Sequence, residues 1–286
     1  MEEKNKIQPS TLYLVGTPIG NLSDISERAV KVLSEVDFVA AEDTRNSLKL
    51  LNALGIHAEM VSYHEHNRRA MGEKILERLQ GGESCALITD AGMPAISDPG
   101  EDMVRLCADA GITVTVGPGP CAAISALALS GLGTRKFVFE GFLSAQKGER
   151  RRRLEELARE KRTVIFYEAP HKLRATLKDM AEIFGEGRRI SLCRELTKLN
   201  EEICRVTLNA AVEIYSEKEP RGEYVLVVEG ADEGIPDSEA TELSSLSPEE
   251  HIAKYMHEGL SRMDAMKRAA KDRGMTKSEL YKLVNN

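Results

Sequence analysis

Short apolar segments alternate with amphipathic helical segments from Thr11 onward, and this alternation most restricts the fold that the chain can adopt. The apolar segments are rich in β-branched residues and apolar at successive positions, which is typical of parallel strands covered by helices on both faces. In the first half they comprise residues 11–16, 36–42, 58–63, 84–90 and 112–117. Strands that alternate with helices indicate βαβ units and a mainly parallel sheet.

A second set of strand-like segments comprises residues 136–142, 163–168, 188–196, 201–208 and 223–230. Only residues 197–200 separate the third from the fourth, which is too short for a parallel crossover and predicts an antiparallel hairpin. We therefore expect an α/β fold with a mainly parallel sheet in residues 1–119 and a mixed sheet in residues 120–230. An apolar helix predicted from Cys121 to Gly131 would lie between the two sheets.

The C-terminal part has a different composition. Residues 231–246 hold five acidic and no basic side chains together with Gly, Pro and Ser, which predicts a linker. Residues 247–286 contain three capping-box patterns, each marking the start of a short helix. The patterns are Ser247 with Glu250, Ser261 with Asp264, and Thr276 with Glu279, and Gly259 and Gly274 would end the first two helices. A small helical domain of helix-turn-helix type is expected.

Composition limits the class of protein. The five cysteines form no CxxC pair and lie within apolar runs, which favours a reducing compartment. The first eight residues have no apolar core, and no apolar run is long enough to cross a bilayer. A soluble cytoplasmic protein is expected. The net charge of −7 argues mildly against a nucleic-acid partner, so any RNA contact must come from local basic clusters.

Three loops at predicted strand ends are candidates for a ligand site, because ligands of open α/β sheets bind at the carboxyl ends of the strands. They are the Gly-rich turn at residues 16–21, the long loop at residues 89–100 with two Asp, and the Gly-Pro-Gly-Pro turn at residues 117–120. The first turn lacks the GxGxxG spacing. Asp43 lies near the position of a ribose-binding acid, which keeps a dinucleotide site open, although Pro18 removes an N–H that a pyrophosphate would use.

These loops in this order resemble the tetrapyrrole-methylase class of methyltransferases, and within it the bacterial enzymes that methylate a ribose 2′-oxygen of a cytidine in the decoding region of 16S ribosomal RNA. The segments that carry the resemblance are residues 15–26, 40–45, 64–67, 89–100, 117–127, 166–173, 194–198 and 222–230. The resemblance implies two α/β domains with S-adenosylmethionine bound in the cleft between them, 16S rRNA or the small ribosomal subunit as partner, and a homodimer.

The resemblance also implies which residues contact the cofactor. They are Gly16, Thr17, Pro18, Gly20, Asp90, Gly92, Ala95, Ile96, Ser97, Cys121, Ala122 and Tyr167. A ribose hydroxyl is a poor acid, so a general base is expected to assist the transfer. Candidates at strand ends are Asp43, His64, Glu168, His171, Glu195 and Lys198. Of these we favour Asp43 and Glu168. His64 and His66 share one face of a strand, but without a third ligand nearby no metal site is expected.

The densest basic cluster follows the strand-like segment 136–142. It consists of Lys147, Arg150, Arg151, Arg152 and Arg153. Four consecutive arginines cover every side of a helical turn, which exceeds what a fold requires, so we predict that they contact RNA phosphates. The helical tail adds eight basic against six acidic residues.

Three other functions remain open from the sequence. A small-molecule methylase on the same fold would need neither basic region. A nicotinamide-dependent oxidoreductase would use the Gly16 turn and Asp43. A non-catalytic RNA-binding adaptor would not need the complete set of loops.

Overall fold

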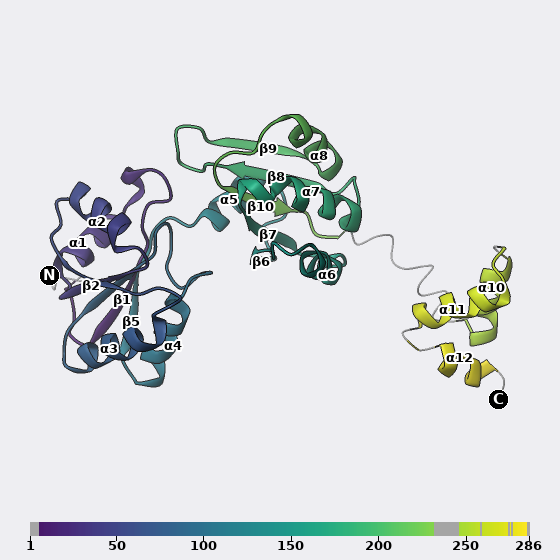
Figure 1. Cartoon of the computed structure of the whole chain (residues 1–286), viewed down its shortest axis with the longest axis horizontal. Helices are drawn as coiled ribbons and strands as arrows, with labels where there is room; N and C mark the ends of the chain where they lie inside the picture. Colours follow the sequence, from purple (N-terminus) through teal and green to yellow (C-terminus); the bar gives the residue numbers. More distant parts are fainter. Residues whose placement is uncertain (1–5, 232–245, 258, 274, 276, 285–286) are drawn as a thin grey trace. The chain divides into compact units, whose positions relative to one another are not determined.

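The computed structural model describes residues 6–231, 246–257, 259–273, 275 and 277–284. The chain divides into two compact units, Met1–Ala231 and Asp232–Asn286. The first unit contains both sheets, and the second contains a group of short helices (Figure 1).

The first sheet has five strands in the order β3-β2-β4-β1-β5, and every pairing in it is parallel. The strands are β1 (Thr11–Val15), β2 (Phe38–Ala41), β3 (Glu59–Ser62), β4 (Cys85–Ile88) and β5 (Thr113–Gly117). The predicted mainly parallel sheet is therefore confirmed. Because all strands run in the same direction, the loops that follow β1, β2 and β4 emerge at one edge of the sheet.

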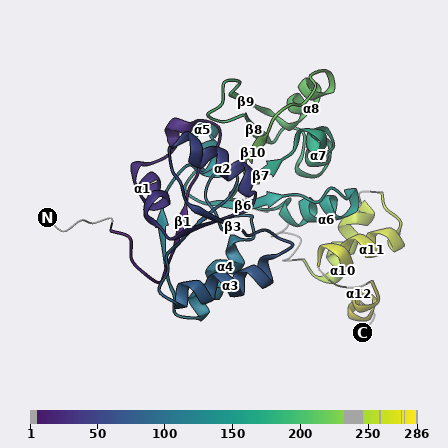
Figure 2. The same ribbon diagram turned by 60° about the vertical axis from the view of Figure 1, so that its left-hand side comes forward.

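Helices cover both faces of this sheet (Figure 2). The helices are α1 (Glu27–Glu35), α2 (Thr44–Ala53), α3 (Arg68–Gln80) and α4 (Gly100–Asp109), with a short 3-10 helix η1 (Leu22–Asp24) before α1. Leu33 of α1 and Leu51 of α2 pack against one face of the sheet. Leu79 of α3 and Met103 of α4 pack against the other face. Burial on both faces explains why the strands are apolar at successive positions.

The second sheet is mixed, as predicted, with the order β6-β7-β10-β8-β9. The strands are β6 (Phe137–Phe142), β7 (Thr163–Glu168), β8 (Arg189–Arg194), β9 (Glu202–Thr207) and β10 (Tyr224–Val228). β6 and β7 are parallel, and β8 and β9 form the expected antiparallel hairpin. Its helices are α5 (Ala122–Ser130), α6 (Lys147–Leu157), α7 (Pro170–Phe184) and α8 (Leu208–Glu217).

Helix α5 corrects one expectation. Its buried residues Ala123, Ala126 and Leu127 pack on the second sheet, opposite the face that carries α7 and α8. The remaining face of the helix is open, and Ile124 is 50% exposed. α5 is therefore a covering helix of the second sheet and is not packed between the two sheets. The boundary predicted at residue 119 falls in the connection between β5 and α5.

The second unit contains α10 (Pro248–His257), α11 (Arg262–Asp272) and α12 (Lys277–Val284). They share a core of Ile252, Tyr255, Ala265, Met266, Ala269, Ala270 and Leu280. The first two predicted caps are confirmed: Glu250 N donates to Ser247 Oγ at 3.2 Å and Asp264 N donates to Ser261 Oγ at 3.2 Å. The cap at Thr276, the helix end at Gly274 and all but the ends of the linker 231–246 lie outside the described residues.

Candidate active site

The three candidate loops meet at the carboxyl edge of the first sheet. Thr17 and Gly92 form an isolated antiparallel bridge, in which Thr17 N donates to Gly92 O at 2.9 Å and Gly92 N donates to Thr17 O at 3.1 Å. A Cβ on Gly16 would come within 2.7 Å of Gly119 Cα. Glycine at position 16 is therefore required for the first loop to approach the third.

The loop at residues 89–100 holds a strained backbone. Ala95 and Ser97 have φ values of 67° and 63°, which non-glycine residues rarely adopt. Asp98 fixes this shape, since its Oδ1 accepts from Ala95 N at 3.0 Å and from Gly100 N at 2.7 Å. Asp98 Oδ2 is buried and has no hydrogen-bond partner among the residues that the structure describes. Strain together with an unsatisfied buried oxygen indicates a ligand site.

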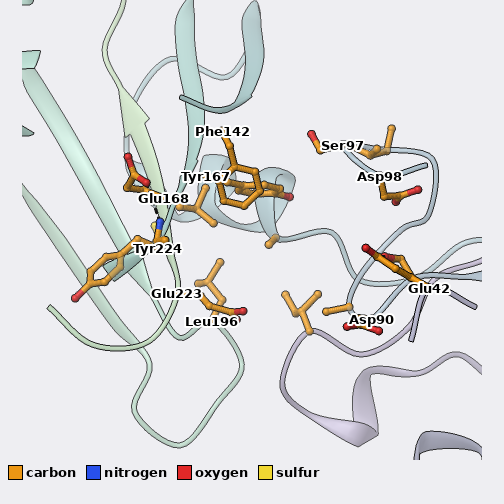
Figure 3. A pocket seen from close by; sticks show the side chains of 18 of the residues that line it. Glu42, Asp90, Ser97, Asp98, Phe142, Tyr167, Glu168, Leu196, Glu223 and Tyr224 are labelled. Carbon is orange, nitrogen blue, oxygen red and sulfur yellow. Dashed lines mark hydrogen bonds between the residues drawn. The ribbon is translucent and has the colours of Figure 1, made fainter. Parts of the chain in front are cut away.

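A cavity of about 890 Å³ opens between this loop and the end of the second sheet. Its walls come from both halves of the first unit. Figure 3 shows Glu42, Asp90, Ser97 and Asp98 on one side and Phe142, Tyr167, Leu196, Glu223 and Tyr224 on the other. Ile19, Ile96 and Ala122 add apolar surface. The cavity therefore combines a carboxylate-rich wall with apolar and aromatic side chains.

The predicted cofactor residues fall into two groups. Those that line the cavity are Asp90, Ile96, Ser97, Ala122 and Tyr167. Those that build the loops beside it are Gly16, Thr17, Pro18, Gly20, Gly92, Ala95 and Cys121. Burial raises the pKa of Tyr167 to about 12, so its hydroxyl stays protonated at neutral pH.

Asp43 does not line the cavity. Its Oδ1 caps α2 by accepting from Arg45 N at 2.9 Å, and its Oδ2 accepts from the Arg45 guanidinium at 2.9 Å. These hydrogen bonds lower the pKa of Asp43 to about 2. The expectation that Asp43 faces the cleft as a base, or holds a ribose in a dinucleotide site, is corrected: its carboxylate has a capping role.

Glu168 lies at the cavity, but its carboxylate is bound by neighbouring residues of the protein. Its side chain is buried, and its two oxygens accept from Thr176 Oγ1 at 2.5 Å, from Ala169 N at 2.9 Å and from Lys172 Nζ at 3.0 Å. Three donors hold this carboxylate in one orientation. Glu168 therefore organises the start of α7.

Glu42 is the acid that the sequence analysis missed. It follows β2 directly, lines the cavity and accepts from Thr89 Oγ1 at 3.2 Å. Burial raises the pKa of Glu42, and the neighbouring carboxylates Asp90 and Asp98 act in the same direction. Glu42 directly follows an apolar strand, but Asp43 is its neighbour and Glu168 also ends an apolar strand, so the sequence does not single it out.

Lys198 carries the positive charge on the opposite wall. Its Nζ donates to Glu195 Oε1 and to Glu223 Oε2, both at 2.8 Å. Burial lowers the pKa of Lys198, but these hydrogen bonds outweigh burial and raise it. Glu195 and Thr197 have φ values of 52° and 65°, so this wall also contains a strained loop. Lys198 and Glu195, considered as bases from the sequence, form an ion pair here.

The basic cluster on α6 is mostly paired within the protein. Arg150 is 5% exposed and its Nε donates to Asp179 Oδ2 at 2.8 Å. Arg151 pairs with Asp179 and Glu182, and Arg153 pairs with Glu140 and Glu156. The argument that four arginines exceed what the fold requires is wrong for Arg150, which is an internal ion-pair partner. Lys147 and Arg152 are exposed and form no ion pair with another residue in the described part of the chain.

The described residues offer no metal site and no membrane-spanning helix. Among them, no group of three or more His, Cys, Asp or Glu side chains is arranged to hold a metal ion. No helix in the described ranges is long and apolar enough to span a membrane. His64 and His66 pack with their rings 5.9 Å apart.

The fold and the cavity define a class: a two-sheet α/β protein that binds a ligand between strand-end loops of its two halves. Comparison with known families makes this more specific. The sequence profile of the tetrapyrrole (corrin/porphyrin) methylases matches residues 11–212, and the chain belongs to that family.

Several relatives match over nearly the full chain and carry the name ribosomal RNA small subunit methyltransferase I. The protein of Halalkalibacterium halodurans is 48% identical over 96% of this chain and 94% of its own length. The Bacillus subtilis protein is 45% identical over 98% and 96% of the two chains. The Escherichia coli O157:H7 protein is 43% identical over 95% and 93%.

Solved structures share the fold at much lower identity. Uroporphyrin-III C-methyltransferase from Thermus thermophilus superposes with a TM-score of 0.55 at 19% identity, covering 76% of this chain and 94% of that one. Cobalt precorrin-4 methyltransferase, a cobalamin biosynthetic enzyme, gives a TM-score of 0.57 at 19% identity, covering 77% and 95%. These matches confirm the predicted fold class.

Proposed function

We propose that this protein is an S-adenosylmethionine-dependent methyltransferase that methylates the 2′-oxygen of a cytidine in 16S ribosomal RNA. The observation that carries the proposal is a cavity with one carboxylate-rich wall in a chain that is 48% identical, over 96% of its length, to a small-subunit rRNA methyltransferase. The relatives' names support small-subunit ribosomal RNA as the substrate, and the cavity supports a ligand site between the two halves of the first unit.

The residues of the cavity fit the proposed cofactor. A sulfonium and an ammonium group are cationic, and Glu42, Asp90 and Asp98 supply negative charge on one wall. The buried Asp98 Oδ2, which lacks a donor among the described residues, is suited to a ligand hydrogen bond. Ile19, Ile96 and Ala122 provide the apolar surface that an adenine ring requires. When bound, S-adenosylmethionine would supply a methyl group activated by the sulfonium charge.

The protein's own contribution is alignment and removal of a proton. Holding the ribose hydroxyl, which accepts the methyl group, in line with the methyl donor would be worth about 7–11 kcal/mol in favourable cases. The hydroxyl must also lose its proton as its oxygen becomes an ether. We assign acceptance of this proton to Glu42, because its raised pKa makes it a better base than an ordinary carboxylate. We favour Glu42 over Asp43, which caps α2, and over Glu168, whose carboxylate is held by Thr176, Ala169 and Lys172.

For RNA binding we retain the exposed members of the basic cluster, Lys147 and Arg152, with Arg151 and Arg153 as partly exposed neighbours. The helical tail contributes Lys254, Arg262, Lys267 and Arg268. Such contacts bind phosphates and supply affinity without reading sequence. We further propose a homodimer and a cytoplasmic location, where ribosomal subunits are assembled.

The decisive experiment is transfer of a labelled methyl group to small ribosomal subunits from cells that lack this protein, followed by mapping of the labelled nucleotide. We expect one labelled cytidine whose label resists base removal, because the methyl lies on the ribose. Label on the base, or none with subunits and naked 16S rRNA alike, would reject the proposal. Transfer to a tetrapyrrole in the same assay would favour the small-molecule methylase instead.

A further inference from the structure

The side chain of Phe142 is an aromatic ring that is exposed at the wall of the cavity. It lies at the end of β6, lines the cavity and is 59% exposed. Aromatic residues are scarce in this chain, which has 13 Phe and Tyr residues and no Trp. Figure 3 shows its ring beside that of Tyr167, on the wall that faces Ser97. Together with Tyr167, whose ring lies 5.4 Å away, Phe142 forms an aromatic surface that is open to the cavity.

A β-bulge gives the ring this direction. In the pairing of β6 with β7, Phe139 is opposite Ile165 and Gly141 is opposite Phe166, so Glu140 is an extra residue. Gly141 has a φ of 71°, as expected at a bulge. In a regular strand, Phe139 and Phe142 would face opposite sides, because side chains alternate. The extra residue puts both on the same side.

The contacts confirm that both rings share this side. The Phe139 and Phe142 rings lie 5.1 Å and 5.4 Å from the ring of Tyr167. The bulge also touches the first half of the protein, since a Cβ on Gly141 would be 3.1 Å from Ser97 Oγ. The bulge therefore lies against the strained 89–100 loop, and the ring of Phe142 lies beside Tyr167.

The ammonium group of Lys172 is held at a fixed position near the Phe142 ring. Lys172 Nζ lies 5.6 Å from the ring centroid of Phe142. It cannot move freely, because it donates to Leu143 O at 3.1 Å and pairs with Glu168 Oε1 at 3.0 Å. The surface is therefore an aromatic ring beside an ion-paired lysine, and the exposed π-face of the ring suits the base of a nucleotide.

We propose that Phe142 is a stacking platform for the base of the nucleotide to be methylated. The proposal rests on the proposed function, because it takes RNA as the substrate. Proteins recognise RNA by stacking unpaired bases on aromatic side chains. The cavity of about 890 Å³ lies near the upper end of the range for small-molecule sites, which leaves room for a base beside the cofactor.

The test compares Phe142→Ala, Phe142→Leu and Phe142→Tyr with a matched control, Phe137→Ala. Phe137 lies at the other end of the same strand, is 38% exposed and is absent from the cavity lining. Loss of a base stack predicts a fall in kcat/KM for small ribosomal subunits of about 5- to 150-fold in Phe142→Ala. Leucine should restore little of this and tyrosine most of it, while Phe137→Ala stays within twofold of wild type.

Two further measurements distinguish a loss of base stacking from a loss of cofactor binding and from a failure of the proposed function. Calorimetry with S-adenosylmethionine should give the same Kd for Phe142→Ala and wild type; a parallel loss would mean that the ring holds the cofactor's adenine and would overturn the proposal. Binding of oligocytidylate, followed by anisotropy, should weaken in Phe142→Ala but not in Phe137→Ala. If wild type methylates no ribosomal substrate, this binding result still decides whether Phe142 stacks bases. Equal binding by all variants would reject the platform even if methylation is confirmed.

Discussion

Replacing Arg150 with methionine should destabilise the second α/β half of the protein and leave RNA affinity nearly unchanged. The guanidinium of Arg150 donates to Asp179 through Nε at 2.8 Å and reaches Ala145 O at 3.3 Å. Asp179 is only 3% exposed, so its charge stays buried when Arg150 is lost. Methionine keeps much of the apolar stem of arginine and removes the charge.

The expected magnitude follows from these contacts. Removing one partner of a buried ion pair costs about 3–5 kcal/mol, because the other charge remains without compensation. Arg151 still donates to Asp179 Oδ1 at 2.9 Å, so we expect the lower end, about 3 kcal/mol. For a domain of this size, that loss lowers Tm by roughly 6–12 °C.

Thermal unfolding followed by circular dichroism measures this effect, with Arg152→Met as the matched control. Arg152 lies on the same helix and is exposed, so its substitution should change stability by less than about 0.5 kcal/mol. The double variant Arg150→Met with Asp179→Leu should recover much of the lost stability, because no buried charge is then left unpaired. An unchanged Tm in Arg150→Met, together with weaker RNA binding than in Arg152→Met, would refute the internal role of Arg150.

Three further predictions concern the cavity and the exposed cations. Glu42→Gln should lower kcat by about 10²- to 10⁴-fold and weaken cofactor binding much less, because Asp90 and Asp98 keep their charges on the same wall. Since the pKa of Glu42 is raised above 4.5 and the base must be ionised, wild-type kcat should fall as pH drops through this raised pKa, and the Gln variant should lack that limb. Asp90→Ala should abolish cofactor binding in calorimetry while Tm is kept, because Asp90 is exposed in the cavity; an unaltered Kd contradicts its assignment. Lys147→Gln with Arg152→Gln should reduce the slope of log K against log salt for single-stranded RNA by about 1.4, and an unaltered slope removes phosphate binding from α6.

Both sheets could be predicted from the sequence because their signals are local. Strands such as Phe38–Ala41 and Cys85–Ile88 are buried along their whole length, which leaves an apolar run in the sequence. The short connection between β8 and β9 fixed their antiparallel pairing by chain length alone. Features that depend on a few consecutive residues can therefore be predicted from the sequence.

Most of the features that the sequence did not predict involve residues far apart in the chain. The partner of Arg150 is Asp179, 29 positions away, and no pattern within α6 indicates it. Glu42 reaches the cavity only through the direction of the chain after β2, whereas Asp43 caps α2 through Arg45 N two positions away, which is a local signal typical of an N-cap Asp. The bulge at Glu140 puts Phe139 and Phe142 on one side of β6, whereas regular alternation would put them on opposite sides. Except for the Asp43 cap, these features depend on tertiary packing.

The two walls of the cavity share a property that bears on catalysis. Ala95 and Ser97 on one wall, and Glu195 and Thr197 on the other, hold left-handed backbone conformations that cost about 1–3 kcal/mol each. Such conformations persist only where neighbouring groups enforce them: Asp98 accepts from the first loop, and Lys198 binds Glu195 at 2.8 Å in the second. Methyl transfer gains chiefly from alignment, which fails if the walls can shift by an ångström. The stability given up in these loops is thus consistent with a site whose shape is fixed before its ligands bind.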